Sequence, residues 1–157
     1  MQPSLSSGRV LIVEPDMERS EQLREAVAAI SVPTVCHDFI GARRILLATP
    51  PDLLVTNIFL GAYNGLHLVH LVAANHFPTK VIVYSSRHDA VLVAEARAAG
   101  AFVEDFSGLA DVLPSYVSGT VVFPDTSVGR EAVEEAHPVT ASEIKLSFWR
   151  EPNNKIV

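Results

Sequence analysis

The sequence predicts an α/β fold in which one parallel β-sheet lies between two layers of helices. Along residues 9–117, short apolar runs typical of buried strands alternate with segments whose apolar residues recur at helical spacing. Five strand–helix units follow one another in this way. Such alternation produces a parallel sheet, because each helix carries the chain back to the starting end of the sheet. The chain has 157 residues, of which 48% are hydrophobic and 19% charged, so it can bury the core of one domain.

The first two units show the pattern clearly. Residues 9–13 (RVLIV) form an apolar run of strand length, and a helix is predicted over residues 17–30. Leu23 and Val27 lie on one stripe of that helix. In the second unit, Asp38 is suited to cap a helix, because its carboxylate can accept hydrogen bonds from free backbone N–H groups. The remaining predicted strands are 33–36, 52–56, 80–84 and 101–103, and the remaining helices are 38–48, 66–75, 90–99 (ended by Gly100) and 109–117.

Glycine and proline positions suggest how the chain is divided. Residues 60–65 (LGAYNG) are predicted to form a loop between the third strand and the third helix. We expect a flexible N-terminus at 1–8, a domain at 9–118 and a C-terminal extension at 119–157, where the alternation stops. Within the extension, residues 143–150 are ambiguous: a capping-box spacing before them favours a helix, and alternating apolar residues favour a strand. We favour the helix.

Composition excludes several classes of protein. The net charge is −6, the pI is about 5.4, and no basic run exceeds Arg43–Arg44, so direct binding to nucleic acid is disfavoured. No apolar run is long enough to cross a bilayer, and the first eight residues lack the features of a signal peptide, so we expect a cytoplasmic protein. The single cysteine, Cys36, cannot form an internal disulfide and is interpreted as a small buried apolar residue.

Four segments of the chain resemble one known family. They are RVLIVEPDMER, PDLLVTNIFLGAYNGLHLV, KVIVYSSRHD and AGAFVEDFSGLADVL, and they cover residues 9–117. In order and spacing they resemble the bacterial response-regulator receiver (CheY-like) domain. The resemblance implies a flavodoxin-like (βα)5 sandwich with strand order 2-1-3-4-5, and a role in two-component signal transduction.

The residues that carry phosphotransfer in that family are altered here. The family has two adjacent acids after the first strand, which help to hold Mg²⁺, and an aspartate after the third strand, which accepts the phosphoryl group. At these places the chain has Glu14, Pro15 and Asn57. Ser85 keeps the hydroxyl that ends the fourth strand. The lysine that ends the fifth strand is replaced by Asp105, or by Ser107 if the positions are simply counted from Ser85; we prefer Asp105.

These changes remove the groups that aspartyl phosphorylation requires. An amide such as Asn57 is not a carboxylate nucleophile and cannot form an acyl phosphate. Mg²⁺ prefers several anionic oxygens, and only Glu14, Asp16 and the main-chain carbonyl of Phe59 remain as candidate ligands. Asp105 would repel a phosphoryl group rather than compensate its charge. We therefore expect a degenerate receiver, or pseudo-receiver, with no bound metal and no cofactor. In such a domain Asn57 could donate to Glu14, and to Asp105 as well, in place of a cation.

Some residues that transmit the phosphorylation signal in the family are kept. Ser85 and Phe102 occupy the positions of its switch residues. For Phe102 we favour an ordinary structural role, and for Ser85 both interpretations stay open. The resemblance also implies an interaction and dimer surface on the fourth helix, fifth strand and fifth helix. The predicted interaction residues are Val91, Leu92, Val93, Phe102, Leu109 and Trp149; the alternative is that these apolar residues complete the core.

Function is therefore expected to reside in binding. The leading hypothesis is a phosphorylation-independent regulatory module that acts by protein–protein interaction, with a homodimer as one form that the predicted surface suggests. The alternative is a small-ligand sensor that uses the vacated phosphorylation site. An enzyme is disfavoured: His67 and His70 lack further metal ligands near them, and Ser85, His88 and Asp89 contain triad residue types without a nucleophile elbow. No glycine-rich loop follows the first strand, which argues against a dinucleotide.

Overall fold

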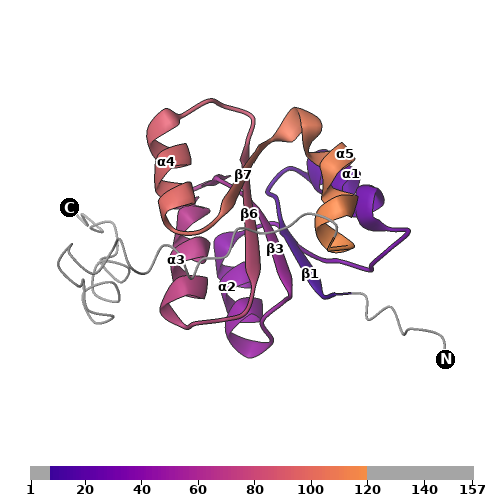
Figure 1. Cartoon of the computed structure of the whole chain (residues 1–157), viewed down its shortest axis with the longest axis horizontal. Coiled ribbons are helices and arrows are strands. Elements are labelled where there is room, and N and C mark those ends of the chain that lie inside the picture. Colours follow the sequence, from indigo (N-terminus) through magenta and orange to yellow (C-terminus); the bar gives the residue numbers. More distant parts are fainter. Residues whose placement is uncertain (1–7, 120–157) are drawn as a thin grey trace, which may run out of the picture. The chain divides into compact units, whose positions relative to one another are not determined.

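The computed structural model describes residues 8–119, which form a five-stranded parallel sheet covered by helices on both faces (Figure 1). The strand order is β2-β1-β3-β6-β7. Apart from the added hairpin described below, this is the predicted order 2-1-3-4-5, so the predicted fold class is confirmed. The strands of the sheet are β1 (Val10–Val13), β2 (Thr34–Cys36), β3 (Leu53–Asn57), β6 (Lys80–Ser85) and β7 (Phe102–Asp105), and the helices are α1 (Met17–Val27), α2 (Phe39–Ala48), α3 (Leu66–Ala74), α4 (Ala90–Ala98) and α5 (Phe106–Val117).

The helices divide into two layers. Helix α1 packs against α5, whereas α3 packs against both α2 and α4. Figure 1 shows α1 and α5 together at the right, with α2, α3 and α4 gathered at the other side of the strands. Every residue of β1 and β3 is buried, as the apolar runs predict for central strands of a parallel sheet. Each fully buried Val, Leu or Ile contributes roughly 1.5–3 kcal/mol relative to an exposed side chain, so these two strands form the centre of the core.

Local signals in the sequence explain most helix ends. The side chain of Asp38 accepts from the backbone N–H of Gly41, as predicted for an N-cap. Gly100 adopts a left-handed φ of 90° and ends α4, which was also predicted. Helix α1 ends at Val27 rather than at residue 30, because the N–H groups of Ile30 and Ser31 both turn back to the carbonyl of Val27.

One element was not predicted. The expected loop at 60–65 contains part of a small antiparallel hairpin, formed by β4 (Phe59–Leu60) and β5 (Tyr63–Asn64). Gly61, the first residue of its two-residue turn, has a positive φ of 70°, a conformation that glycine adopts without steric cost. The hairpin therefore follows directly from the end of β3 and leads into α3.

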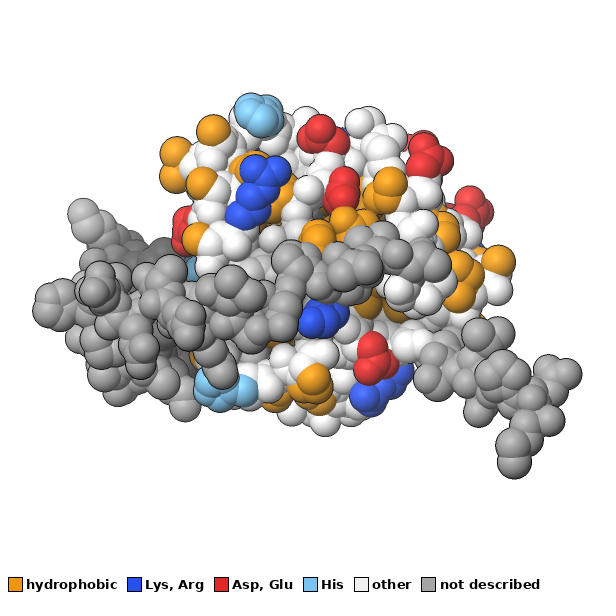
Figure 2. All heavy atoms as spheres, viewed as in Figure 1, with side chains coloured by type: hydrophobic (Ala, Val, Ile, Leu, Met, Phe, Trp, Pro, Cys, Tyr) orange, Lys and Arg blue, Asp and Glu red, His pale blue; other side chains and the backbone are white. Residues whose placement is uncertain are grey.

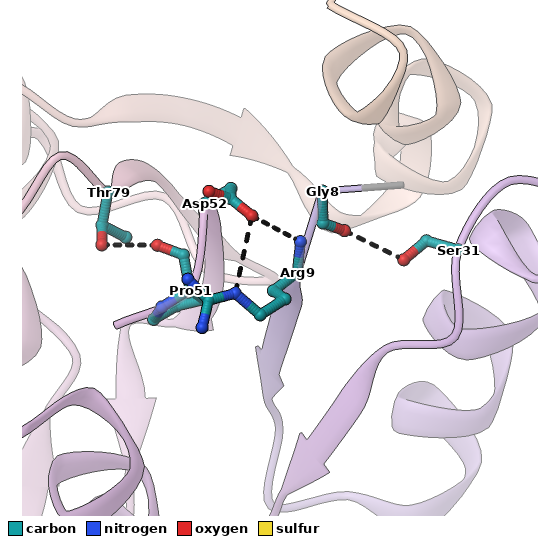
Figure 3. A network of polar contacts seen from close by, with 6 residues as sticks. All are labelled: Gly8, Arg9, Ser31, Pro51, Asp52 and Thr79. Carbon is teal, nitrogen blue, oxygen red and sulfur yellow. Dashed lines mark hydrogen bonds and ion pairs between the residues drawn. The ribbon is translucent and has the colours of Figure 1, made fainter. Parts of the chain in front are cut away.

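Polar contacts hold the strands together at the amino end of the sheet, opposite the end where the hairpin lies (Figure 3). The backbone N–H of Arg9 donates to the carboxylate of Asp52 at 2.6 Å, and the Arg9 side chain forms an ion pair with the same carboxylate at 3.8 Å. The hydroxyl of Thr79 donates to the carbonyl of Pro51 at 2.6 Å, and that of Ser31 donates to the carbonyl of Gly8 at 3.1 Å. These contacts fix the starts of the strands and the loop before β2.

Predictions for the extension lie outside the described residues. They include the domain boundary after 118, the helix at 143–150 and the position of Trp149. Within residues 8–119, none of the helices combines the length and apolar character needed to cross a membrane.

Candidate functional site

A row of four side chains crosses the carboxyl end of the sheet. Val13 is in register with Thr56, so Glu14 follows beside Asn57. Asn57 is in register with Tyr84, and Tyr84 with Glu104. Residues in register on parallel strands point to the same face of a sheet. Contacts from α1 and α5, described below, place this row beneath those two helices.

The carboxylate of Glu14 is the main hydrogen-bond acceptor of the row. It is only 1% exposed, and it accepts three hydrogen bonds. The backbone N–H of Asp16 donates to Oε1 at 2.9 Å, the amide Nδ2 of Asn57 donates to Oε2 at 2.9 Å, and the hydroxyl of Tyr84 donates to Oε2 at 2.7 Å. A buried carboxylate is costly unless it is well hydrogen-bonded, so these donors are what make Glu14 compatible with the core.

Asn57 uses both ends of its amide. While Nδ2 donates to Glu14, Oδ1 accepts from the backbone N–H of Phe59 at 3.0 Å. The predicted hydrogen bond to Glu14 is therefore confirmed. The predicted second partner, Asp105, is wrong: its side chain is exposed, and the N–H of Phe59 at the start of the hairpin is the partner instead.

The backbone of Asn57 is approached closely from α3. Gly65 precedes this helix, and a Cβ atom built on it would lie 2.2 Å from the carbonyl oxygen of Asn57. That separation is well inside van der Waals contact. Only glycine fits here, for reasons of space rather than of backbone conformation.

Tyr84 is a site residue that the sequence did not reveal. Burial, and then its hydrogen bond to Glu14, raise the pKa of the Tyr84 hydroxyl far above its ordinary value, while Arg19 acts in the opposite direction. The hydroxyl is therefore a permanent donor to Glu14. The only signal in the sequence was a tyrosine in an otherwise aliphatic strand, one residue before Ser85.

Two side chains from the helices close over Tyr84. The ring of Phe106, the first residue of α5, lies 5.7 Å from the ring of Tyr84. The guanidinium of Arg19, from α1, stands over Phe106 at 5.2 Å, and its Nη1 lies 3.5 Å from the hydroxyl of Ser86. Arg19 thus acts electrostatically on the Tyr84 hydroxyl and contacts the loop after β6.

The two residues at switch positions have local partners. The hydroxyl of Ser85 donates to the carbonyl of Arg87 at 2.7 Å and lies 2.9 Å from the backbone N–H of the same residue. Phe102 is half-buried and meets Tyr116 edge to face at 5.5 Å. The hydroxyl of Tyr116 donates to Glu104 at 2.6 Å, and burial together with this bond raises its pKa. Both positions have ordinary structural partners.

The residues present do not fit the Mg²⁺ that the receiver family implies. Pro15 offers no side-chain oxygen, and Asp16 caps α1 by accepting from the N–H of Arg19. Both oxygens of Glu14 already accept hydrogen bonds from protein groups. In the part of the chain that the structure describes, no three His, Cys, Asp or Glu side chains are grouped so that they could hold a metal ion.

Comparisons with solved structures agree with this architecture. A signal receiver domain from Vibrio parahaemolyticus matches with a TM-score of 0.67 and 20% identity, over 83% of this chain and 98% of that domain. The receiver domain of a Francisella response regulator matches with a TM-score of 0.63 and 18% identity, over 70% of this chain and 93% of that one. The response regulator domain of Thermotoga maritima CheB matches with a TM-score of 0.60 and 21% identity, over 73% of this chain and 97% of that one.

The chain has the receiver fold. At these identities the likeness concerns the fold alone. No family model matches the sequence, and no curated protein matches it either.

The surface on which receiver-like interaction was predicted is only partly exposed. Val91 on α4 is 74% exposed, and Figure 2 shows hydrophobic side chains gathered over this helix. Leu92, Val93 and Phe102 are half-buried. Leu109 was wrongly placed on the surface: it is 0% exposed, because it shares the inward stripe of α5 with Leu113 and Tyr116. Trp149 lies outside the described residues.

The other candidate residues do not form a reactive centre. His67 lies beside the rings of Phe39 and Tyr63, at 5.9 and 6.5 Å, and burial is the main cause of its lowered pKa. His70 lies 3.5 Å from Glu95 on α4. His67 is exposed and His70 is partly exposed, and each also contacts a neighbouring element.

Ser85, His88 and Asp89, which are the residue types of a catalytic triad, do not contact one another as a triad would. The carboxylate of Asp89 caps α4 through the N–H groups of Val91 and Leu92, and His88 is exposed. The Ser85 hydroxyl is held by Arg87. Each group has a structural partner in place of a catalytic one.

Proposed function

We propose that this receiver-fold domain is a signalling or regulatory module that acts by protein–protein interaction and without phosphorylation. The observation that carries the proposal is the double use of the Asn57 amide. Its nitrogen donates to Glu14 and its oxygen accepts from Phe59, so the residue at the phosphoacceptor position joins β1 to the hairpin. A neutral amide held at both ends has no nucleophilic role.

Two further positions support the absence of phosphotransfer. Pro15 removes the second acid after β1, and Asp105 ends β7 in register with Ser85, where the family has its lysine. A phosphoryl group at residue 57 would then face acidic side chains without a compensating metal or lysine. The same pairing of polar groups supports a binding protein rather than an enzyme.

The alternative, a small-ligand sensor, has less support. A ligand site needs polar atoms directed toward the ligand. Here the carboxylate of Glu14, the amide of Asn57 and the hydroxyl of Ser85 are satisfied by one another or by the backbone. Among the described residues, every buried side-chain nitrogen or oxygen has a hydrogen-bond partner.

Phosphorylation is tested by incubating the full chain with acetyl phosphate and Mg²⁺ and measuring its intact mass. We expect no phosphoryl adduct, under conditions in which a receiver domain with an aspartate acceptor is modified. The Asn57→Asp variant should also remain unmodified, because the second acid and the lysine are still missing. A stoichiometric, base-labile adduct on the unaltered chain would refute the proposal.

The interaction part needs a separate measurement. Partners captured by the full chain should be the same with and without a phosphodonor, and the same for Asn57→Ala if that variant folds. A partner that binds only after incubation with the phosphodonor would contradict phosphorylation independence. Capture by the chain lacking residues 120–157 shows whether the receiver-fold domain or the extension carries the contact.

A further inference from the structure

Helix α2 has an apolar face that the fold does not use. Its inner stripe packs into the core, and its outer stripe has a second set of large apolar side chains at helical spacing. Ile40 is 60% exposed and Leu47 is 43% exposed, and Arg44 lies between them at i+4 from Ile40. We call Ile40, Arg44 and Leu47 the α2 face. The inner stripe consists of Phe39, Ala42 and Leu46.

The charge of α2 is opposite to that of the chain. The chain has a net charge of −6, yet α2 contains Arg43 and Arg44 and no acidic residue. Of the other helices within residues 8–119, α1 and α5 carry more acidic than basic residues, and α3 and α4 have no excess of either. The α2 face is thus a positive, partly apolar strip on an acidic protein, and its field favours an acidic partner.

The start of α2 is held in place by the hairpin. The ring of Tyr63, from the hairpin, stacks on Phe39 of the inner stripe at 4.5 Å. The stacking joins the hairpin to the first turn of the helix, which carries Ile40. Stacked rings and a packed inner stripe make this a rigid surface, which lowers the entropic cost of binding.

We propose that the α2 face binds an acidic amphipathic helix of a partner protein. Leucine-like side chains at i, i+4 and i+7 of the partner would contact Ile40 and Leu47, and a carboxylate between them would pair with the guanidinium of Arg44. An anionic membrane fits less well, because surface-bound helices carry several basic residues and the net charge of −6 opposes approach. The inference rests on the proposed function only in that both involve protein binding.

The test uses the full chain, labelled with ¹⁵N, and a synthetic helical peptide of leucine, alanine and glutamate with leucines spaced i, i+4 and i+7. We expect saturable shifts of the amide signals of α2, and no such shifts with a scrambled peptide of the same composition or with lysines in place of the glutamates. Arg44→Glu should weaken binding about tenfold or more. Arg97→Glu makes the same charge change at an exposed position on α4 and should leave the affinity unchanged.

Ile40→Asp should abolish the shifts of the α2 amide signals. Because Ile40 is exposed, the thermal unfolding of this variant should match that of the unaltered chain. Several results would overturn the inference: no shifts in α2, equal binding of the scrambled peptide, equal weakening by Arg97→Glu, or binding to phosphatidylserine vesicles without binding to the peptide. None of these depends on phosphorylation, so the acetyl phosphate experiment can fail while this one succeeds, and the reverse.

Discussion

The Asn57→Asp substitution is the most direct test of the buried row. It replaces a donor that lies 2.9 Å from the Glu14 carboxylate with a second carboxylate, nearly isosteric with the amide. Two unit charges about 4 Å apart repel by about 4 kcal/mol at an effective dielectric constant of about 20. Loss of a hydrogen bond to a charged buried group costs about 1.5–3 kcal/mol more.

Protonation limits the cost. Two carboxylates that share one buried site hold a proton more tightly than the same groups do in the unfolded chain, so the full repulsion is not realised. We expect a net destabilisation of about 3 kcal/mol at pH 7. Because the folded variant binds more protons than the unfolded chain at mildly acidic pH, its stability falls as the pH rises and recovers as the pH is lowered.

The assay is thermal or urea unfolding of the full chain at pH 7 and at pH 5. At pH 7 we expect the melting temperature to fall by about 10 °C, and at pH 5 the difference should shrink. Asn57→Ala, which removes the donor without adding charge, should lose stability by a similar amount at both pH values. The Glu14→Gln/Asn57→Asp double variant exchanges amide and carboxylate and should recover most of the loss.

A melting temperature at pH 7 equal to or above that of the unaltered chain would contradict the role of Asn57 as a donor to Glu14. So would a loss for Asn57→Asp that does not change with pH, because two carboxylates that share one buried site take up a proton as the pH falls.

Three further predictions follow from the same site. Tyr84→Phe removes one of the three donors to Glu14 and should lower the free energy of unfolding, measured in urea, by about 1.5–3 kcal/mol. Tyr116→Phe removes a donor to the partly exposed Glu104 and should cost less, so equal losses would contradict the special role of Tyr84. Gly65→Ala places a methyl group 2.2 Å from the carbonyl oxygen of Asn57 and should lower the free energy of unfolding by more than about 3 kcal/mol. Gly108→Ala in α5, with open space around its Cβ, should be neutral or stabilising, and a tolerated Gly65→Ala would contradict the close approach. Titration of the chain with Mg²⁺ in a calorimeter should give no specific binding heat, since both Glu14 oxygens are occupied by protein donors, and micromolar affinity would contradict that account.

The fold was largely predictable because its signals are local. The apolar runs of β1 and β3 and the cap at Asp38 depend on a few adjacent residues, and so does the glycine that ends α4. The hairpin was missed because strands of two residues are too short to show a periodic pattern.

The site was only partly predictable, because it depends on pairing between distant strands. The Asn57–Glu14 bond follows from the rule that parallel strands end at one edge of the sheet, so it could be predicted. The role of Tyr84 depends on strand register and on the reach of its side chain, which the sequence does not encode locally. Leu109 was misplaced because its exposure was inferred from the family's interaction face, whereas its spacing to Leu113 and Tyr116, at i+4 and i+7, places it on the inward stripe of α5.

The saturated carboxylate of Glu14 also limits how the site can change by single mutations. A phosphorylatable site needs an aspartate at 57, a second acid at 15 and a cation at 105, and it needs Glu14 free to approach a metal. The first of these changes creates an uncompensated pair of buried carboxylates, and removing Tyr84 first leaves Glu14 short of a donor. Either of these two opening steps therefore lowers stability while no metal or compensating charge is present. The order of substitutions matters in consequence: a cation at the exposed position 105 can come first at little cost, whereas an aspartate at 57 cannot.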